Sequence, residues 1–168
     1  SGKSTLLKLL AGITPPSGGK LKIGGRVAAL LELGVGFHPE LTGLENIFLL
    51  GSVLGVPRDV IRHRLDAIIA FADIGAFIHA PVRNYSTGMT VRLGFAVATH
   101  MDPDIILLDE VISVGDADFQ TKSFDRIRQM KRRGVTILVV THQIDAVERI
   151  CDRVLWLKDG AVEARGDV

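Results

Sequence analysis

The sequence predicts an α/β fold with a mostly parallel central sheet and a helical insertion. Two short aliphatic runs, at 105–108 and 135–140, have the composition of strands that are buried on both faces of a parallel sheet. An amphipathic helix is expected between them, at 119–133. The stretch from about residue 42 to 83 contains helical patterns without a strand between them. We therefore expect a single domain over residues 1–168, with a helical subdomain at about 42–100.

Composition limits the classes of function. The chain has 168 residues, of which 47% are hydrophobic and 23% charged, as is ordinary for a globular α/β protein. The formal net charge of +1 gives no electrostatic reason to expect nucleic acid or an anionic membrane surface as a partner. The single cysteine, Cys151, cannot form an internal disulfide and is expected in buried packing. No apolar run has membrane-spanning length and no signal peptide is recognisable, so a membrane would be reached through a partner.

The first residues match the end of a phosphate-binding loop. Gly2-Lys3-Ser4 fits the last positions of the pattern G-x-x-x-x-G-K-[ST]. In that loop backbone N–H groups surround phosphates, the lysine reaches the terminal phosphates, and the hydroxyl binds magnesium. Taken alone, the triplet is explained equally well by a helix that opens with small polar residues. The chain starts inside this loop, so we expect it to be a fragment.

Short strands are expected next, at 21–23 and 26–31, joined by a Gly-Gly turn. The second strand leads to Glu32, which either faces a magnesium site or is an ordinary loop acid. Thr42 and Glu45 form a capping box, which predicts that a helix starts there. This helix is expected to end near Gly55, and a second one follows Pro57.

Ser86-Thr87-Gly88 opens a further predicted helix. Small polar residues at a helix start leave N–H groups that can bind an anion. An N-cap by Ser86 explains the same residues without a ligand.

Polar side chains follow both aliphatic runs. Asp109 and Glu110 come directly after the first run, at the end of a strand, where ligands bind in open α/β sheets. They fit a magnesium nucleotide: one carboxylate holds the metal or its water, and the other orients or deprotonates the attacking water. A core strand followed by two solvated acids is the alternative. His142 follows the second run and either reaches a γ-phosphate or caps the strand. A helix at 144–151 and a hairpin of 153–158 with 161–164 complete the chain.

The order of these motifs resembles that of the ATP-binding cassette ATPases, and the resemblance covers essentially the whole chain. The ordered elements are Gly2-Lys3-Ser4, the helical insertion, Ser86-Thr87-Gly88, Asp109-Glu110, residues 113–116 and His142. The resemblance implies a P-loop NTPase that binds ATP and Mg²⁺ and hydrolyses ATP. It implies that Glu110 is the catalytic base and that His142 contacts the γ-phosphate. The implied nucleotide-binding residues are Ser1, Gly2, Lys3, Ser4, Thr5, Ser86, Thr87, Gly88 and Asp116, and the implied metal ligands are Ser4, Asp109 and Glu32.

The signature motif of that family is usually Leu-Ser-Gly-Gly-Gln, and here it reads Tyr85-Ser86-Thr87-Gly88-Met89. Ser86 and Gly88 keep their places, whereas Thr87 and Met89 depart from the majority pattern. In the family this motif contacts the γ-phosphate bound to the opposite subunit. The resemblance therefore implies a head-to-tail homodimer, with Asp116 in the loop that links the two sites.

Residues 34–43, the altered signature and residues 114–116 are similar to the branch of the family that exports polysaccharides: lipid-linked O-antigen, capsular polysaccharide or teichoic acid. This branch implies integral-membrane permease subunits as partners, a lipid-linked glycan as the transported substrate, no nucleic acid, and a location on the cytoplasmic face of the inner or plasma membrane. Glu32 falls where most cassettes carry a glutamine, so its part in holding Mg²⁺ is left open.

Two other functions are considered. A soluble cassette that acts on nucleic acid or ribosomes is disfavoured by the near-neutral charge, the absence of a second cassette and residues 33–43, which we call the export-type segment. A nucleotide-binding module that no longer hydrolyses ATP is disfavoured because Lys3, Asp109, Glu110 and His142 occur together.

Overall fold

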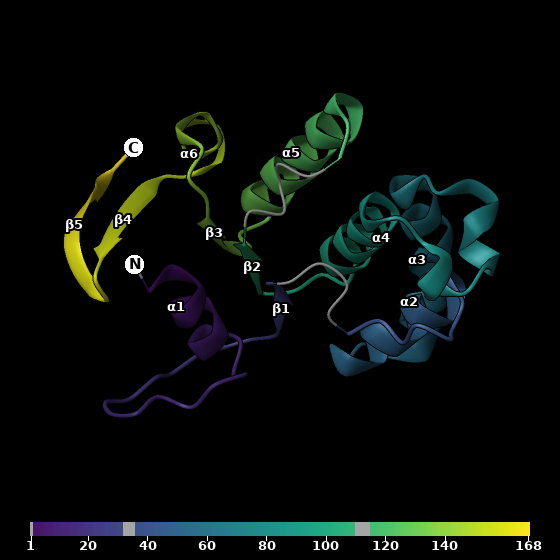
Figure 1. Ribbon diagram of the computed structural model, residues 1–168, viewed down its shortest axis with the longest axis horizontal. Helices are drawn as coiled ribbons and strands as arrows, with labels where there is room; N and C mark the ends of the chain where they lie inside the picture. Colours follow the sequence, from purple (N-terminus) through teal and green to yellow (C-terminus); the bar gives the residue numbers. More distant parts are fainter. Residues whose placement is uncertain (1, 32–35, 110–114) are drawn as a thin grey trace.

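A three-stranded parallel sheet lies at the centre of the α/β part (Figure 1). The computed structural model describes residues 2–31, 36–109 and 115–168. The strands are β1 (Val27–Leu30), β2 (Ile105–Asp109) and β3 (Thr136–Val140), in the order β1-β2-β3. Leu30 pairs with Leu108, and Asp109 pairs with Val140. The carboxyl ends of the three strands therefore share one edge, the edge at which α/β sheets bind ligands.

Helices cover both faces of this sheet. Helix α1 (Lys3–Leu10) lies on one face, and α4 (Thr87–His100) and α5 (Ala117–Arg132) lie on the other (Figure 1). Leu7 of α1 packs with Leu107 and Val140 in a small buried cluster, which fixes α1 against β2 and β3.

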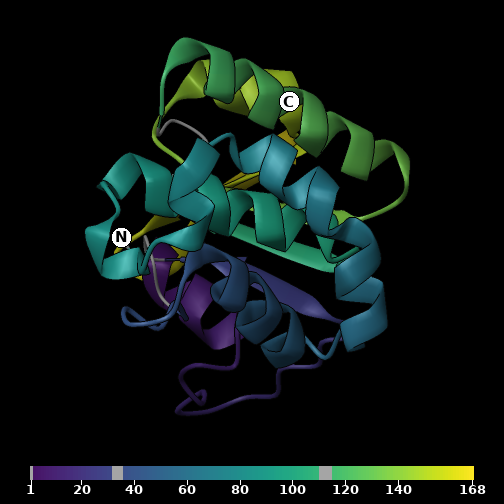
Figure 2. The same ribbon diagram turned by 90° about the vertical axis from the view of Figure 1, so that its right-hand side faces the viewer.

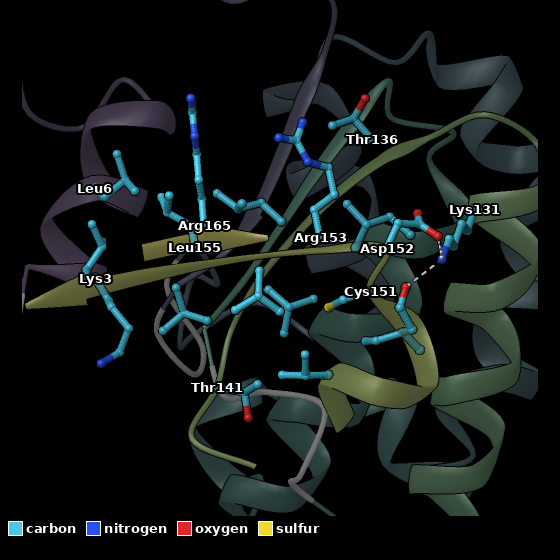
Figure 3. A pocket seen from close by; sticks show the side chains of 18 of the residues that line it. Lys3, Leu6, Lys131, Thr136, Thr141, Cys151, Asp152, Arg153, Leu155 and Arg165 are labelled. Atoms are coloured by element: carbon cyan, nitrogen blue, oxygen red, sulfur yellow. Dashed lines mark hydrogen bonds and ion pairs between the residues drawn. The ribbon is translucent and has the colours of Figure 1, made fainter. Parts of the chain in front are cut away.

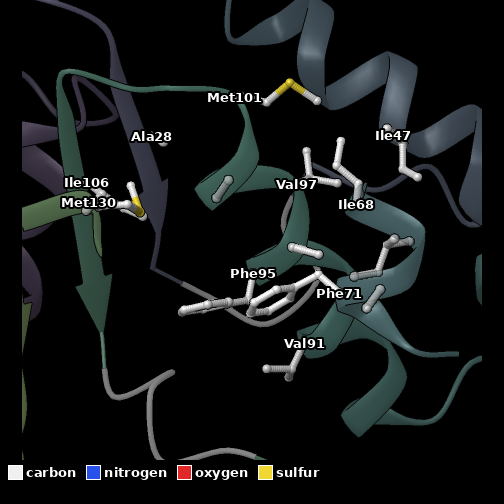
Figure 4. Packing of buried hydrophobic residues seen from close by; sticks show 14 of the residues in the cluster. Ala28, Ile47, Ile68, Phe71, Val91, Phe95, Val97, Met101, Ile106 and Met130 are labelled. Carbon is white, nitrogen blue, oxygen red and sulfur yellow. The ribbon is translucent and has the colours of Figure 1, made fainter. Parts of the chain in front are cut away.

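The larger core lies on the helical side of the molecule. It is formed by α2 (Gly43–Val53), α3 (Arg58–Ala72), the short 3₁₀ helices η1 (Gly75–His79) and η2 (Val82–Asn84), and α4, with α5 alongside (Figure 2). Phe95 is at its centre, with ring centroids 5.9 Å from Phe71 and 6.0 Å from Phe119 (Figure 4). Such aromatic pairs add to the free energy gained from apolar burial.

The C-terminal part contains α6 (Ile144–Ile150) and a hairpin of β4 (Arg153–Lys158) and β5 (Ala161–Asp167). Within the described ranges, β4 and β5 pair with each other and not with the three-stranded sheet. No helix in the described part of the chain combines the length and the apolarity needed to span a membrane.

Local signals in the sequence predict most of these elements correctly. The capping box forms as expected: the Thr42 side chain accepts the Glu45 N–H, and Glu45 accepts the Thr42 N–H at 2.8 Å. Ser86 caps α4. Strand β5 extends to Asp167, beyond the predicted end at 164.

One expectation is wrong. Residues 21–23 form no strand, because this exposed stretch pairs with no other described strand, and a single strand is not stable by itself. Cys151 packs against the larger core, as expected, but it is only half-buried there, and burial raises the pKa of its thiol.

Candidate functional site

The start of α1 is built to receive an anion. Gly2 precedes the helix with a φ of 90°, a left-handed conformation that favours glycine. A Cβ at this position would lie 3.3 Å from Gly160 Cα, so a side chain would also press on the turn of the hairpin. Ser4 and Thr5 are exposed in the first turn, and Lys3 is half-buried beside them. The N–H groups of a first helical turn have no partner within their own helix, and the helix dipole favours negative charge there.

Asp109 lies at the edge of the sheet that α1 approaches. The cluster of Leu7, Leu107 and Val140 joins the helix to both strands, and Asp109 is two residues beyond Leu107 on β2. Thr141 directly follows Val140 on β3. The start of α1, Asp109 and the residues after β3 are therefore positioned by one small apolar contact.

These groups are of the kind that holds magnesium together with a phosphate. No cluster of three or more His, Cys, Asp or Glu side chains occurs within residues 2–31, 36–109 and 115–168. Mg²⁺ is commonly held by one or two carboxylates, with phosphate and water as its other ligands. The carboxylate of Asp109 and the hydroxyl of Ser4 are suited to such a site.

His142 lies in the turn after β3. The Gln143 N–H donates to the Thr141 hydroxyl at 3.0 Å, which holds this turn, and the His142 side chain is exposed. Its place at the carboxyl end of β3 is the place expected from the sequence.

A hollow of about 690 Å³ lies between α1, β3, α6 and β4 (Figure 3). Its wall is mainly aliphatic, and residues of β3 and β4 are among its lining. Lys3 and Thr141 lie toward the same side of this hollow. Because its wall is mainly aliphatic, the hollow is less suited to a triphosphate than the exposed first turn of α1, although Lys131, Arg153 and Arg165 are also among the lining residues.

The second expected anion site, the start of α4, lies elsewhere. Ser86 accepts the Met89 N–H at 3.2 Å, as an N-cap does. Ser86 and Thr87 are exposed, and a Cβ on Gly88 would meet only the Ser86 Oγ, at 3.8 Å. Helices α1 and α4 lie on opposite faces of the sheet (Figure 1), so one chain does not bring Ser86-Thr87-Gly88 and Lys3 together.

Tyr85, at the first position of the altered signature, holds the start of α4 in place. Its hydroxyl donates to the Phe77 carbonyl at 2.7 Å, and burial raises the pKa of the phenol. The same hydroxyl lies where a Cβ on Gly43 would be, so α2 must begin with glycine. Sequence analysis recognised Tyr85 only as part of a motif, because its partners are eight and 42 residues away in the chain.

Asn46 is a second residue that sequence analysis missed. Its side chain is 0% exposed, and its Oδ1 accepts the His38 N–H at 2.7 Å. Its Nδ2 lies 2.9 to 3.1 Å from the carbonyl oxygens of Thr42, Leu41 and His38. Asn46 thereby holds the described part of the export-type segment against α2. A polar residue inside a helix carries no sequence signal for such a role.

Asp116 caps α5, where its carboxylate accepts the Phe119 N–H at 2.9 Å. This hydrogen bond holds the pKa of Asp116 below its ordinary value, and the guanidinium of Arg92 acts in the same direction. Three candidate residues, Ser1, Glu32 and Glu110, lie outside the described residues.

Comparison with known sequences gives close relatives. A sequence model of the family described as ABC transporter matches residues 1–113. The chain is 53% identical over 166 residues to an O-antigen export system ATP-binding protein of Myxococcus xanthus, covering 99% of this chain and 38% of that protein. A protein of the same name from Klebsiella pneumoniae is 51% identical over 159 residues, or 95% of this chain and 65% of that protein. A teichoic acids export ATP-binding protein of Bacillus anthracis is 44% identical over 168 residues, or 100% of this chain and 30% of that protein. The chain therefore spans less than two thirds of the length of these relatives.

Solved structures share the fold. An ATP-binding subunit of an ABC transporter superposes with a TM-score of 0.91 at 25% identity, over 99% of this chain and 74% of that one. A dimeric ATP-binding cassette in a post-hydrolysis state, bound to ADP and Pi, gives a TM-score of 0.84 at 24% identity, over 99% and 80% of the two chains. The predicted fold class, an α/β P-loop NTPase with a mostly parallel sheet and a helical insertion, is confirmed.

Proposed function

The chain belongs to the ABC transporter family, and from this premise we propose that it is the ATP-hydrolysing subunit of an exporter of lipid-linked polysaccharide. Relatives at 53% and 44% identity are named for export of O-antigen and of teichoic acids. The observation that carries the proposed ATPase activity is the small cluster that brings the start of α1 and Asp109 to one edge of the sheet.

The residues at this edge then have definite roles. Lys3 binds the β- and γ-phosphates, with the backbone N–H groups of residues 1–5 around them. Ser4 and Asp109 hold Mg²⁺, and Glu32 is a further candidate ligand. When bound with ATP, Mg²⁺ neutralises charge on the transferred phosphoryl group. Glu110 orients and deprotonates the attacking water, and His142 contacts the γ-phosphate.

Neither nucleotide site is complete within one chain under this proposal. The start of α4 lies on the far face of the sheet from α1 (Figure 1), so its N–H groups and Ser86-Thr87-Gly88 serve the nucleotide of a second copy. The functional unit is then a head-to-tail homodimer that closes around two ATP molecules. Hydrolysis releases the dimer, since the added phosphate contacts are lost.

Closing and opening of the dimer drives transport by a partner protein. We assign that partner to integral-membrane permease subunits, which hold the protein at the cytoplasmic face of the inner or plasma membrane. The exported substrate is a lipid-linked glycan, and nucleic acid has no part in the cycle.

ATP hydrolysis by the full-length protein tests the proposal. The protein is purified together with the membrane protein encoded beside it, and turnover is measured with and without a lipid-linked glycan. Stimulation by the glycan, absent in a Glu110→Gln variant, is the expected result. Turnover that responds to RNA or ribosomes, and not to the glycan or the permease, would contradict the exporter and favour a soluble cassette. No turnover under any of these conditions would contradict the ATPase itself.

A further inference from the structure

Arg92, in α4, contacts the ends of two other helices, α3 and α5. It is the only Arg, Lys, Asp or Glu in α4, whose other residues are mostly apolar or small. One guanidinium nitrogen lies 3.5 Å from the Asp116 carboxylate at the start of α5 and 3.8 Å from the Asp73 carboxylate at the end of α3. The guanidinium also lies over the ring of Phe119, 4.8 Å from its centroid. One side chain therefore contacts the N-terminal end of α5 and the C-terminal end of α3.

A contribution to the stability of the fold does not by itself account for these contacts of Arg92. The Arg92 side chain is only 21% exposed, whereas those of its two partners are 72% and 62% exposed. The buried Nε of Arg92 has no hydrogen-bond partner in the described part of the chain. Ion pairs with such exposed carboxylates contribute little to stability, and a buried donor without a partner lowers it. The other contacts of Arg92, with the Phe119 ring and with the Asp73 carbonyl at 3.5 Å, also fix how the ends of α3 and α5 lie against α4.

The geometry that Arg92 imposes concerns Asp116. The Asp116 carboxylate accepts the Phe119 N–H and faces Arg92, so it is held from both sides. Gly115, just before it, has a φ of 105°, and a Cβ there would lie 3.1 Å from a ring carbon of Phe119. Gly115 and Asp116 are the first described residues after Asp109 at the end of β2. Arg92 thus fixes the point where the chain leaving β2 enters α5.

We propose that Arg92 is a positioning residue that holds Asp116 at a fixed position relative to the start of α4. Ser86 is six residues before Arg92 on the same helix, about 9 Å along its axis. A shift of Asp116 relative to Ser86 would misalign two groups that must meet the second copy together. The inference rests on the proposed function, because it assigns Arg92 to the closing of the two-site dimer.

The chain offers a matched control in Arg126. It is also half-buried, its Nε is also buried without a partner in the described residues, and it also joins α5 to α4. It donates to the Thr99 carbonyl at 2.6 Å, at the other end of α4 from Ser86. Arg126→Met therefore removes a similar contact between the same two helices without touching Asp116.

The test compares full-length Arg92→Met, Arg92→Lys and Arg126→Met. Methionine keeps the contact with Phe119 and loses the charge, and lysine keeps the charge but cannot reach both carboxylates in the same way. We expect Arg92→Met to lower kcat about tenfold, since small misplacements of catalytic parts are costly, while KM for ATP changes by less than about twofold. ATP-driven dimerisation should weaken in step with kcat. Arg92→Lys should restore part of the loss, and Arg126→Met should keep wild-type kcat.

Wild-type kcat in Arg92→Met, or an equal loss in Arg126→Met, would overturn the inference. A second readout separates this failure from failure of the proposed function. If the wild-type protein does not hydrolyse ATP, the proposed function fails, and hydrogen exchange at the Phe119 amide decides the role of Arg92. Faster exchange in Arg92→Met than in Arg126→Met supports positioning of Asp116, and equal exchange in both overturns it.

Discussion

The helical side and the hairpin side of this molecule are packed very differently. We define the helical side as α2 to α5, and the hairpin side as α1, β4 and β5. On the helical side most of the large apolar side chains are buried: Phe95 is only 1% exposed, although Phe77 in η1 is 52% exposed. On the hairpin side the one tryptophan, Trp156, is 61% exposed, and every residue of β5 is exposed. In α1, Leu7 is the one buried member of its apolar cluster, and Leu10 packs against that cluster partly buried.

The two sides differ in how much their packing stabilises the fold, and proposed binding residues lie on both of them. Well-packed elements resist local opening, whereas elements with few buried contacts open readily and can be ordered by what they bind. Lys3 and the other proposed phosphate-binding residues at the start of α1 are on the loosely packed side, and the proposed donors for the second copy begin a helix of the well-packed side. A nucleotide shared by two copies would then contact the start of α1 in one copy and the start of α4 in the other.

The largest expected loss of stability comes from replacing Phe95, in the core of the helical side. Phe95→Ala removes a side chain that contacts both Phe71 and Phe119, and should lower the free energy of unfolding by about 3 to 5 kcal/mol. Urea unfolding measures this loss. Trp156→Ala is the control on the hairpin side, with an expected loss below about 1 kcal/mol. Equal losses in the two variants would mean that the two sides do not differ in stability.

Asn46 should give the next largest effect. Asn46→Leu keeps the size of the side chain but leaves the His38 N–H without a partner, at a cost of about 1 to 3 kcal/mol. The carbonyl groups of His38, Leu41 and Thr42 lose the Asn46 side chain but keep a backbone N–H donor each. Urea unfolding again provides the measurement. Ser52 is exposed on the same helix, and Ser52→Ala should be neutral. A neutral Asn46→Leu would show that its hydrogen bonds do not hold the export-type segment.

A smaller effect on stability is expected when the pH is lowered, because of His100 at the end of α4. Burial, followed by the charge of Arg126, lowers the pKa of His100 from 6.5 to about 4. Between these two values the unfolded chain binds a proton at His100 and the folded protein does not, so stability falls as pH falls from 6.5 towards 4. His100 is partly exposed, so we expect only about 1 kcal/mol over this range.

Unfolding at pH 7 and pH 5 measures this dependence. His100→Gln should flatten it, whereas His63→Gln, which changes an exposed histidine of α3, should leave it as in the wild type. The same slope in His100→Gln and the wild type would rule out His100 as its source.

Local chemistry in the sequence predicts the elements and the motif residues, and tertiary pairing decides the rest. The capping box at Thr42, the N-cap at Ser86 and the buried strand before Asp109 each depend on neighbours within a few residues. Residues 21–23 carry a strand-like pattern, but whether a strand forms depends on a partner elsewhere in the chain. The contacts of Arg92 with Asp73 and Asp116 join residues 19 and 24 positions apart, which no periodicity reveals. That α1 and α4 lie on opposite faces of the sheet also follows from topology and not from a motif.

The central claim is that each nucleotide site is shared between two copies, and mixing two inactive variants tests it most directly. Full-length Lys3→Ala lacks the phosphate lysine, and Ser86→Arg blocks the start of α4 that serves the other copy. Each variant alone should be inactive as a dimer. A mixed dimer carries both changes in one site and leaves the other intact, so an equal mixture should recover about a quarter of wild-type turnover if copies pair at random. A mixture as inactive as its two components, or a fully active Ser86→Arg dimer, would contradict the shared site.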